Sequence, residues 1–530
     1  MRIKTQLQTG IDLADRVKTI LGLKGWTLHR VSQRSLVLYG NRSHYFIPHG
    51  FYRDLRLGKF SPSLHQLCAL SHISGYELLD WLRVFGFDLN GVLRLQASLP
   101  FKRTRFLDPS LDNRNAWIPW FQDAAGGPIP VGIAPLGRLI KPSQPRRLRS
   151  LSEANTRGFM YVKIGREDAL AFPDLLPGSI VRVNPEISEG LLSEEDGRAL
   201  GRIFLIEHSK GLCCCRLRWQ GKNRIIPLSS HLPYAYIELH IPSEARILGV
   251  VDMEIRRLSD TEQPAVLGDP TRGWRSERWD QQERGLGGLL RRARRRAALS
   301  FREASAMSRR IADFLGDERY FAAAGSLSDY EARDTPPRHI HKVLTLCLLY
   351  GVQFSEFLNA AGIAMEELGA NEIPAGFISG PERAGTGGTT EIQIRNPTLD
   401  SLLARFVALP FFLRKYLEPL SGMKKLSLRD FFWVGAEFEA FHPYLKDGLL
   451  LIVNRRKKRV IHLRPLPLWR QPLYVLETRT GGYLCACCSL EDGVLVAHPY
   501  LTDFQPSLQF RNRDDAEVVG QVVAIARRLG

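Results

Sequence analysis

Apolar residues recur with the spacing of α-helices in two separate regions of this chain. In residues 63–87 and again in 339–363 they lie three or four positions apart, and each stretch is broken once, at Gly75 and at Gly351. That period predicts two short amphipathic helices, one on either side of each glycine. We expect the region after each helical stretch to be rich in β-strands. The pattern therefore predicts an α+β protein in which a helical domain is followed by a mostly-β domain, twice over.

The strand-rich regions are two diverged copies of one sequence. Gly165 to Asn184 lies over Gly435 to Asn454 at a constant offset of 270 residues, without a gap. Two further matches follow in the same order at offsets of 272 and 271: GLCCCRLRWQG from Gly211 with YLCACCSLEDG from Tyr483, and ARILGVVDMEIRRL from Ala245 with AEVVGQVVAIARRL from Ala516. The helical regions correspond more weakly. Three ordered matches indicate a tandem duplication.

Polar segments with Pro and Gly separate the predicted domains. The expected order is a helical domain at 1–95, an extension at 96–157, a strand-rich domain at 158–259, a linker at 260–285, a second helical domain at 286–370, a linker at 371–425 and a second strand-rich domain at 426–530.

The net charge and the hydropathy of the chain limit the classes of partner that we expect it to bind. Lysine and arginine number 73 against 55 acidic residues, a net charge of +18, which suits a polyanion such as nucleic acid without identifying it. No apolar run approaches the ~20 residues that span a bilayer, and the N-terminus lacks an apolar signal sequence. We therefore expect neither secretion nor a membrane anchor.

Six of the eight cysteines fall in two clusters, at 213–215 and at 485, 487 and 488. This spacing is not a disulfide framework and favours a reducing cytoplasm. Alternate cysteines share one face of a strand, so four thiolates would reach a zinc ion if the two strands met. Neither a CxxC knuckle nor a histidine at ligand spacing accompanies them. Buried apolar thiols are the favoured interpretation, and we expect no metal and no cofactor.

The helical regions carry the marks of a known DNA-binding family. From Leu289 the sequence LLRRARRRAALSFREASAM has a basic first helix, then Ser300 and Glu303 in the capping-box pattern. SLSDYEARDTPPRHIHKVLTLCLLYGVQFSEFL follows from Ser326. This order resembles the Cro/CI-type (XRE) helix-turn-helix repressors. The first half has a weaker version, GWTLHRVSQRS from Gly25 and FYRDLRLGKFSPSLHQL from Phe51. Both copies depart from the family by about a dozen extra residues before the expected recognition helix.

The strand-rich regions resemble the LexA/CI self-cleaving peptidase fold. The shared pattern is Leu-x-x-Gly-x-(apolar)-x-Val-Asn, which ends at Asn184 and at Asn454. By this resemblance Ala169 and Glu439 stand where the family has its nucleophilic serine, and Cys215 and Cys487 where it has its lysine base. A Ser-Lys dyad needs a hydroxyl and a desolvated amine, so neither copy is expected to cleave itself. In this family the fold joins subunits, which implies a homodimer or an intramolecular pairing of the two copies.

The resemblance implies a non-catalytic regulator that binds double-stranded DNA. The expected contacts of the first copy are Arg30, Gln33 and Arg34 on helix two and His49, Tyr52, Arg53 and Arg56 around the recognition helix; those of the second are Arg291, Arg292, Arg294, Arg295 and Arg302. The arginine run from 291 has a second interpretation as a solvated helix face. Asp329, Glu331 and Asp334 of the second copy are expected to face phosphates and repel them.

Two alternatives stay open at this point. One is an interaction scaffold whose helix-turn-helix folds no longer read DNA. The other is a residual self-cleaving protease that uses a thiol.

Overall fold

The computed structural model describes most of the chain, as two compact units. The helical unit comprises residues 1–96, 108–114 and 281–384, and the sheet unit comprises 97–107, 115–280 and 385–530. The described residues are 10–58, 61–111, 120–123, 132–143, 158–186, 201–221, 223–228, 237–260, 285–374, 377–378, 392–393, 397–407, 409–417, 428–435, 445, 448–461, 471–499, 506–511 and 514–529. The α+β class is confirmed, because the chain has many helices and a large antiparallel sheet. The two helical regions belong to one unit and the two strand-rich regions to the other.

The helical unit is built from two successive sets of short helices. The first set is α1 (Gly10–Gly22), α2 (Leu28–Tyr39), α3 (Phe51–Arg56), α4 (Leu64–Ser74), α5 (Leu78–Val84) and α6 (Leu89–Ser98). The second is α9 (Gly285–Arg296), α10 (Phe301–Leu315), α11 (Ala324–Ala332), α12 (Ile340–Tyr350) and α13 (Phe354–Ala360). Short 3-10 helices lie at Pro109–Leu111, Glu318–Tyr320 and Met365–Glu367.

Local sequence sets the ends of these helices. Ser300 caps α10 in a capping box with Glu303, as the sequence predicts, and Ser63 caps α4 in the same way. Gly75 and Gly351 end α4 and α12 with left-handed backbone, which glycine adopts without steric cost. The break that the apolar pattern places at each glycine is therefore a helix C-terminus.

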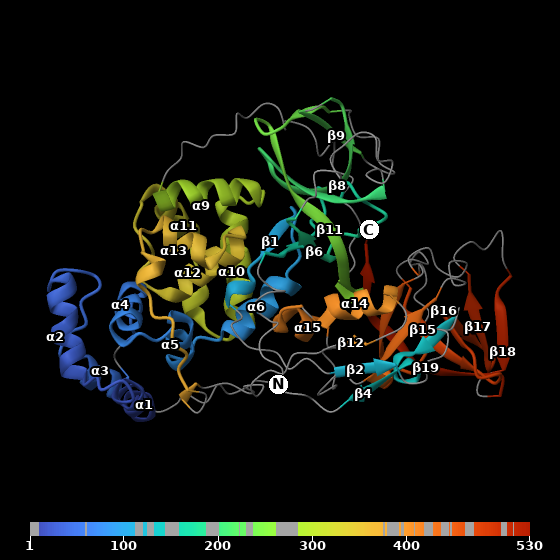
Figure 1. The fold of residues 1–530 in the computed structure, drawn as a ribbon, viewed down its shortest axis with the longest axis horizontal. Coiled ribbons are helices and arrows are strands. Elements are labelled where there is room, and N and C mark those ends of the chain that lie inside the picture. Colours follow the sequence, from blue (N-terminus) through green and yellow to red (C-terminus); the bar gives the residue numbers. More distant parts are fainter. Residues whose placement is uncertain are drawn as a thin grey trace. The chain divides into compact units, whose positions relative to one another are not determined.

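The two sets of helices share several contacts between corresponding helices. In the first, α1 contacts α3 and α5, and α2 contacts α4; in the second, α9 contacts α11 and α13, and α10 contacts α12. Figure 1 shows α9 to α13 gathered in one bundle. The sets also touch each other, since the ring of Phe87 lies 4.7 Å from that of His341 and a backbone bridge joins Tyr76 to Asn371.

The sheet unit is dominated by one large sheet with the strand order β10-β9-β8-β7-β11-β19-β15-β16-β17-β18. The first half of the chain supplies β1 (Arg105–Leu107), β3 (Ile133–Pro135), β5 (Met160–Lys163), β6 (Ile180–Asn184), β7 (Phe204–His208), β8 (Gly211–Trp219), β9 (Arg224–Leu228), β10 (Leu239–His240) and β11 (Ala245–Arg257). The second supplies β13 (Phe431–Val434), β14 (Leu449–Asn454), β15 (Leu473–Thr478), β16 (Tyr483–Glu491), β17 (Val494–His498), β18 (Leu508–Arg511) and β19 (Ala516–Arg528).

Smaller elements complete the sheet unit. A three-stranded sheet combines β2 (Trp120–Asp123), β4 (Ile140–Ser143) and β12 (Ile392–Gln393). Its helices are α7 (Leu136–Leu139), α14 (Pro397–Val407) and α15 (Phe411–Leu417), with 3-10 turns at Leu258–Asp260 and Leu428–Asp430.

The strand pairings of the first half recur in the second. β11 pairs with both β6 and β7, and β19 pairs with both β14 and β15. Each long strand has two β-bulges: those of β11 fall at positions 248 and 252, and those of β19 fall 271 residues later, at 519 and 523. Gly249 and Gly520 stand beside the first bulge, where a Cβ atom would collide with the carbonyl oxygen of Asn184 or Asn454. The identity of these glycines in the two copies thus has a steric reason.

The two halves join through their last strands. β11 and β19 are antiparallel, with Ile255 opposite Ala526, its counterpart at an offset of 271. The pairing is locally two-fold about that position, since Met253 faces Arg528 and Arg257 faces Ala524. Beside it the buried carboxylate of Glu254 accepts hydrogen bonds from Arg256 and Arg527, which are counterparts in the repeat.

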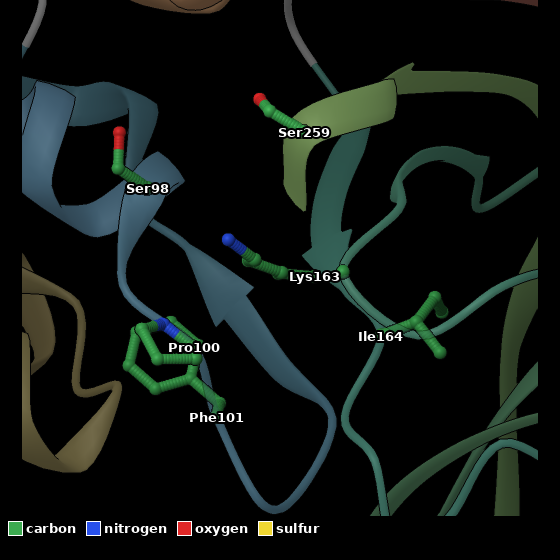
Figure 2. Close-up of a pocket in the computed structure, with 7 residues that line it drawn as sticks. Ser98, Pro100, Phe101, Lys163, Ile164 and Ser259 are labelled. Atoms are coloured by element: carbon green, nitrogen blue, oxygen red, sulfur yellow. The ribbon is translucent and has the colours of Figure 1, made fainter. Parts of the chain in front are cut away.

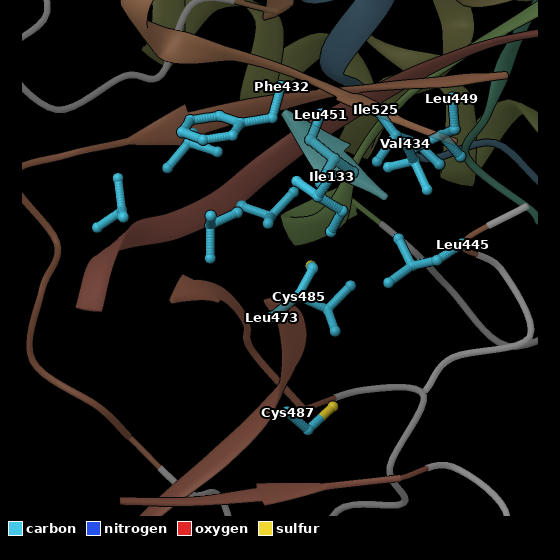
Figure 3. Close-up of a cluster of buried hydrophobic side chains, with 14 residues drawn as sticks. Ile133, Phe432, Val434, Leu445, Leu449, Leu451, Leu473, Cys485, Cys487 and Ile525 are labelled. Atoms are coloured by element: carbon cyan, nitrogen blue, oxygen red, sulfur yellow. The ribbon is translucent and has the colours of Figure 1, made fainter. Parts of the chain in front are cut away.

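The segments expected as an extension and a linker are more than connections. β3, within 96–157, pairs with β13 of the second half, and Ile133 packs in a buried cluster with Phe432, Val434 and Leu451 (Figure 3). The 371–425 segment contains α14 and α15. Strands as short as β3 show no alternation of apolar and polar residues, so their sequence predicts only loops.

No single helix in the described ranges is long and apolar enough to cross a membrane. α12 and α13 reach that length only together, and the chain bends by 115° between them.

Candidate nucleic-acid interface

The second helix of the first copy, α2, exposes a polar and basic face. Thr27 caps the helix by accepting a hydrogen bond from the backbone N–H of Arg30. Val31, Ser32 and Ser35 point inward and are buried, whereas Arg30, Gln33 and Arg34 are exposed. All three side chains expected on helix two therefore face outward, and residues 30 and 34 are one turn apart on the same side.

A buried serine clamp fixes the extra residues that follow α2. The Ser35 hydroxyl accepts from the backbone N–H of Ile47 at 3.1 Å and lies 3.4 Å from its carbonyl oxygen, and Ser32 Oγ donates to that oxygen at 2.8 Å. These bonds tie the end of the insertion back to the helix just before α3 begins. The clamp thus positions the chain that leads into α3.

Aromatic residues of the expected first insertion pack against one another and the helices, and Tyr39 belongs to α2 because that helix continues to residue 39. Tyr39 and Tyr45 stack with ring centroids 5.0 Å apart, and the hydroxyl of Tyr39 lies 2.8 Å from Nδ1 of His72. Burial raises the pKa of Tyr39 to about 12. Both rings thus have a packing role.

The third helix, α3, is short and presents two arginines. Phe51 and Leu55 anchor it by burial, and Arg53 and Arg56 are exposed on its other side. Tyr52 differs from the expectation, because its hydroxyl donates to Oδ1 of Asp15 on α1 at 2.7 Å and so stabilises the helix position.

Histidine extends this surface towards α2. His49, just before α3, is exposed and stacks on His29 of α2 with ring centroids 5.2 Å apart. The basic face of α2 and the start of α3 are therefore neighbours.

The same serine clamp exists in the second copy, with a shorter insertion than the sequence predicts. The Ser308 hydroxyl accepts from the N–H of Ala322 at 2.9 Å and donates to its carbonyl oxygen at 3.1 Å. The segment RRIADFL is not inserted but continues α10 to Leu315, so the break between helices covers only residues 316–323. The expected dozen extra residues are wrong here because apolar residues continue the helical period through Leu315.

The acidic residues of the second copy do not all face outward, which corrects the expectation that they repel phosphates. Glu331 is buried and accepts from Arg294 Nε at 2.7 Å and Nη2 at 3.0 Å. Asp334 accepts from the backbone N–H of Gly287 at 3.1 Å, near the start of α9. Asp329 on α11 and Asp334 just after it are both exposed. The contacts of Glu331 and Asp334 hold α11 against α9.

This packing also removes Arg294 from the expected phosphate contacts. Its guanidinium forms an ion pair with Glu331, and its side chain is mostly buried. Arg291 donates to the backbone carbonyl of Glu331 at 3.0 Å, and Arg292 is half-buried. Arg295 and Arg302 are exposed. The arginine run of α9 therefore serves the fold as well as the surface.

In the first copy, the two positions that the resemblance assigns to a peptidase dyad do not face each other. Ala169 is buried in a hydrophobic cluster that includes Cys214, whereas Cys215 belongs to a different cluster with Cys213 and Leu170. Because side chains alternate along a strand, the residue of β8 on the side of Ala169 is one position away from the expected one. Alignment by distance to a loop glycine misses such a shift.

In the second copy the thiol is buried, and burial favours its neutral form. Cys487 packs in the cluster of Figure 3, and burial raises its pKa to about 12. Glu439, the other expected position, lies outside the described residues.

Sequence reasoning found the outward residues of α2 and α3 but missed the serines that position them. Ser35 and Ser308 fall on the apolar side of their helices, and a polar residue at a core position was the available signal.

Within the described part of the chain, no three His, Cys, Asp or Glu side chains are grouped to hold a metal ion. No protein-family model, no curated protein and no solved structure matches this chain.

Proposed function

We propose that this chain is a non-catalytic transcription regulator that binds double-stranded DNA in a sequence-specific manner, with two helix-turn-helix units and two LexA-like domains that have lost their peptidase dyad. The observation that carries the proposal is the exposed basic face formed by α2 and α3 of the first copy. Arg30 and Arg34 come from the second helix and Arg53 and Arg56 from the third. Those are the two helices that a helix-turn-helix protein sets against the DNA backbone and major groove.

The two copies differ in what they present. α3 exposes two arginines, of which Arg53 pairs with Asp54 at 3.4 Å, whereas α11 exposes Gly325, Ser328, Asp329 and Ala332. Phosphates attract the first set and gain no ion pair from the second. We therefore assign DNA reading to the first copy and a supporting role to the second.

The pairing of β11 with β19 supports one further part of the proposal. In the resembled family the strand-rich domain joins two chains, and here the last strands of both copies lie side by side within one chain. An intramolecular pair thus takes the place of a homodimer.

A duplex titration tests the proposal. We expect affinity to fall with salt, with a slope of log K against log salt of about −0.9 for each phosphate neutralised. The double variant Arg30→Ala/Arg34→Ala should make that slope shallower by the contribution of about two neutralised phosphates. Arg511→Ala is the control, because Arg511 is also exposed but lies on β18 in the sheet unit. A slope that both variants leave unchanged contradicts the proposal.

Sequence preference tests which copy reads the groove. On a selected duplex, Arg53→Ala/Arg56→Ala should cost about 1–3 kcal/mol for each base that the missing guanidinium recognises. Asp329→Ala, on the corresponding helix of the second copy, should leave preference unchanged. The reverse result assigns reading to the second copy, and equal negligible losses support a scaffold.

The scaffold alternative has its own observation. Val37 is 75% exposed, and Leu36 and Leu38 beside it on α2 are also exposed. Apolar residues grouped on a surface are typical of protein contacts. If the chain binds no duplex and Val37→Asp abolishes self-association in sedimentation, the scaffold function is correct.

A thiol protease finds no support in the geometry. The thiol form of Cys487 predominates at neutral pH, whereas the nucleophile of such an enzyme is the thiolate. The intact mass of the chain should stay constant during alkaline incubation, and a product that disappears in Cys487→Ala would contradict this.

A further inference from the structure

A cavity of about 200 Å³ opens in the sheet unit where the end of α6 meets β5. Ser98, Phe101, Lys163 and Ser259 are among the residues that line it. Ser98 and Ser259 are exposed at its rim, and Lys163 is only 1% exposed. Figure 2 shows the Lys163 side chain turned towards the space between the two serines. The cavity therefore has hydroxyl groups at the mouth and an ammonium group at depth.

Lys163 is held in place by the protein around it. Its Nζ donates to the carbonyl oxygen of Ala97 at 2.5 Å, near the C-terminus of α6. The same atom lies 5.7 Å from the ring centre of Phe101 and 5.9 Å from that of Tyr416 on α15. Aromatic faces and a helix C-terminus both stabilise a positive charge. These contacts orient a cation within the cavity wall.

A second buried cation lies directly opposite the first. β1 and β5 are antiparallel, and their register sets Arg105 against Lys163. Arg105 is 6% exposed, and burial lowers its pKa. Like charges directly opposite each other on neighbouring strands destabilise a sheet, and low polarity strengthens the repulsion. An anion bound in the cavity against Lys163 would offset part of that repulsion.

We propose that this cavity is a binding site for a small oxyanion, a phosphate or carboxylate group, whose negative charge lies against Lys163 and whose oxygens accept hydrogen bonds from the Ser98 and Ser259 hydroxyls at the rim. The volume suits a compact ion, because a water molecule takes about 30 Å³ in the liquid and a phosphate takes the room of only a few. The site belongs to the sheet unit alone and does not depend on DNA binding.

Calorimetric titration of the full chain, without DNA, tests the site with two probes: inorganic phosphate and acetate. Both are titrated in chloride buffer at constant ionic strength. Saturable binding of either one supports the proposal, and the stronger of the two identifies the ligand chemistry. If neither binds more tightly than chloride, the proposal is wrong.

Two variants separate the cavity from other cationic surfaces. Lys163→Met should abolish binding of the preferred probe, whereas Lys458→Met, which removes an exposed lysine that does not line the cavity, should leave it unchanged. Equal binding by native protein and Lys163→Met means that the probe binds elsewhere and overturns the proposal. Should Lys163→Met not fold, Ser259→Ala decides: affinity at least threefold weaker supports the site, and unchanged affinity overturns it.

Discussion

Glu254 joins the two halves of the sheet unit, and its neutral variant should loosen them. Its carboxylate is fully buried, accepts from Ser179 at 2.6 Å, and faces Arg256 of its own strand and Arg527 of β19. Glu254→Gln keeps the shape and removes the charge, which leaves two guanidinium groups buried without it. Removing one member of a buried ion pair costs about 3–5 kcal/mol. We expect a loss of that size in the free energy of opening β11 from β19.

Acid should produce the same effect in the native protein. Burial opposes ionisation of Glu254, but the guanidiniums of Arg527 and Arg256 and the Ser179 hydroxyl outweigh it, so its pKa is lowered. A lowered folded pKa means that the stabilisation is present above the unfolded pKa of about 4.3 and is lost as the pH falls through the folded pKa. The difference between native protein and Glu254→Gln should be full at neutral pH and shrink in strong acid.

Hydrogen exchange of the β11 and β19 amides, read by mass spectrometry, measures this opening directly. Glu517→Gln is the matched control, because Glu517 is on β19 but forms an exposed pair with Lys458 at 2.6 Å. Exposed pairs contribute about 0.2–1 kcal/mol. If Glu254→Gln costs no more than this control, the buried triad does not hold the halves together and the reasoning fails.

Three further predictions concern single side chains. Ser308→Ala should lower stability by about 1–3 kcal/mol in thermal unfolding, because it leaves a buried backbone N–H and carbonyl without their clamp. Gly520→Ala should lower the free energy of unfolding by about 1–3 kcal/mol, because it forces a Cβ against the Asn454 carbonyl. Gly325→Ala, which lies in open space on a helix, should raise it by about 0.5–1 kcal/mol. Equal shifts in melting temperature would contradict both predictions. With its pKa at about 12, Cys487 should resist iodoacetamide at pH 8, where roughly one thiol in ten thousand is ionised; alkylation as fast as in unfolded protein would refute its burial.

The sequence could predict the structural features that the internal duplication or a fixed apolar period determines. The bulge positions and the glycines of β11 and β19 follow from one pattern used twice, because Gly249 and Gly520 meet the same carbonyl contact. The outward residues of α2 follow from helical period and capping at Thr27. These features depend on local geometry, which a single sequence contains.

It was harder to predict which way a charged side chain faces and with which side chain it forms an ion pair. Glu331 was expected to face outward, but it lies four residues after Leu327 on the buried side of α11. There it forms an ion pair with Arg294. The cation pair of Arg105 and Lys163 depends on the register of two strands 58 residues apart, which no local pattern encodes. Contacts of this kind arise only after the strands have met.

The position of β3 in the sheet constrains how the chain is made. About 300 residues separate Ile133 from its partner Val434, so the ribosome needs about 15–60 s to supply that partner at 5–20 residues per second. During this time the apolar edge that β3 will cover has not been synthesised, and β3 itself has nowhere to pair. Early release at a stop codon before β13 would leave the first half with an unmatched strand, a typical target for chaperones and proteases.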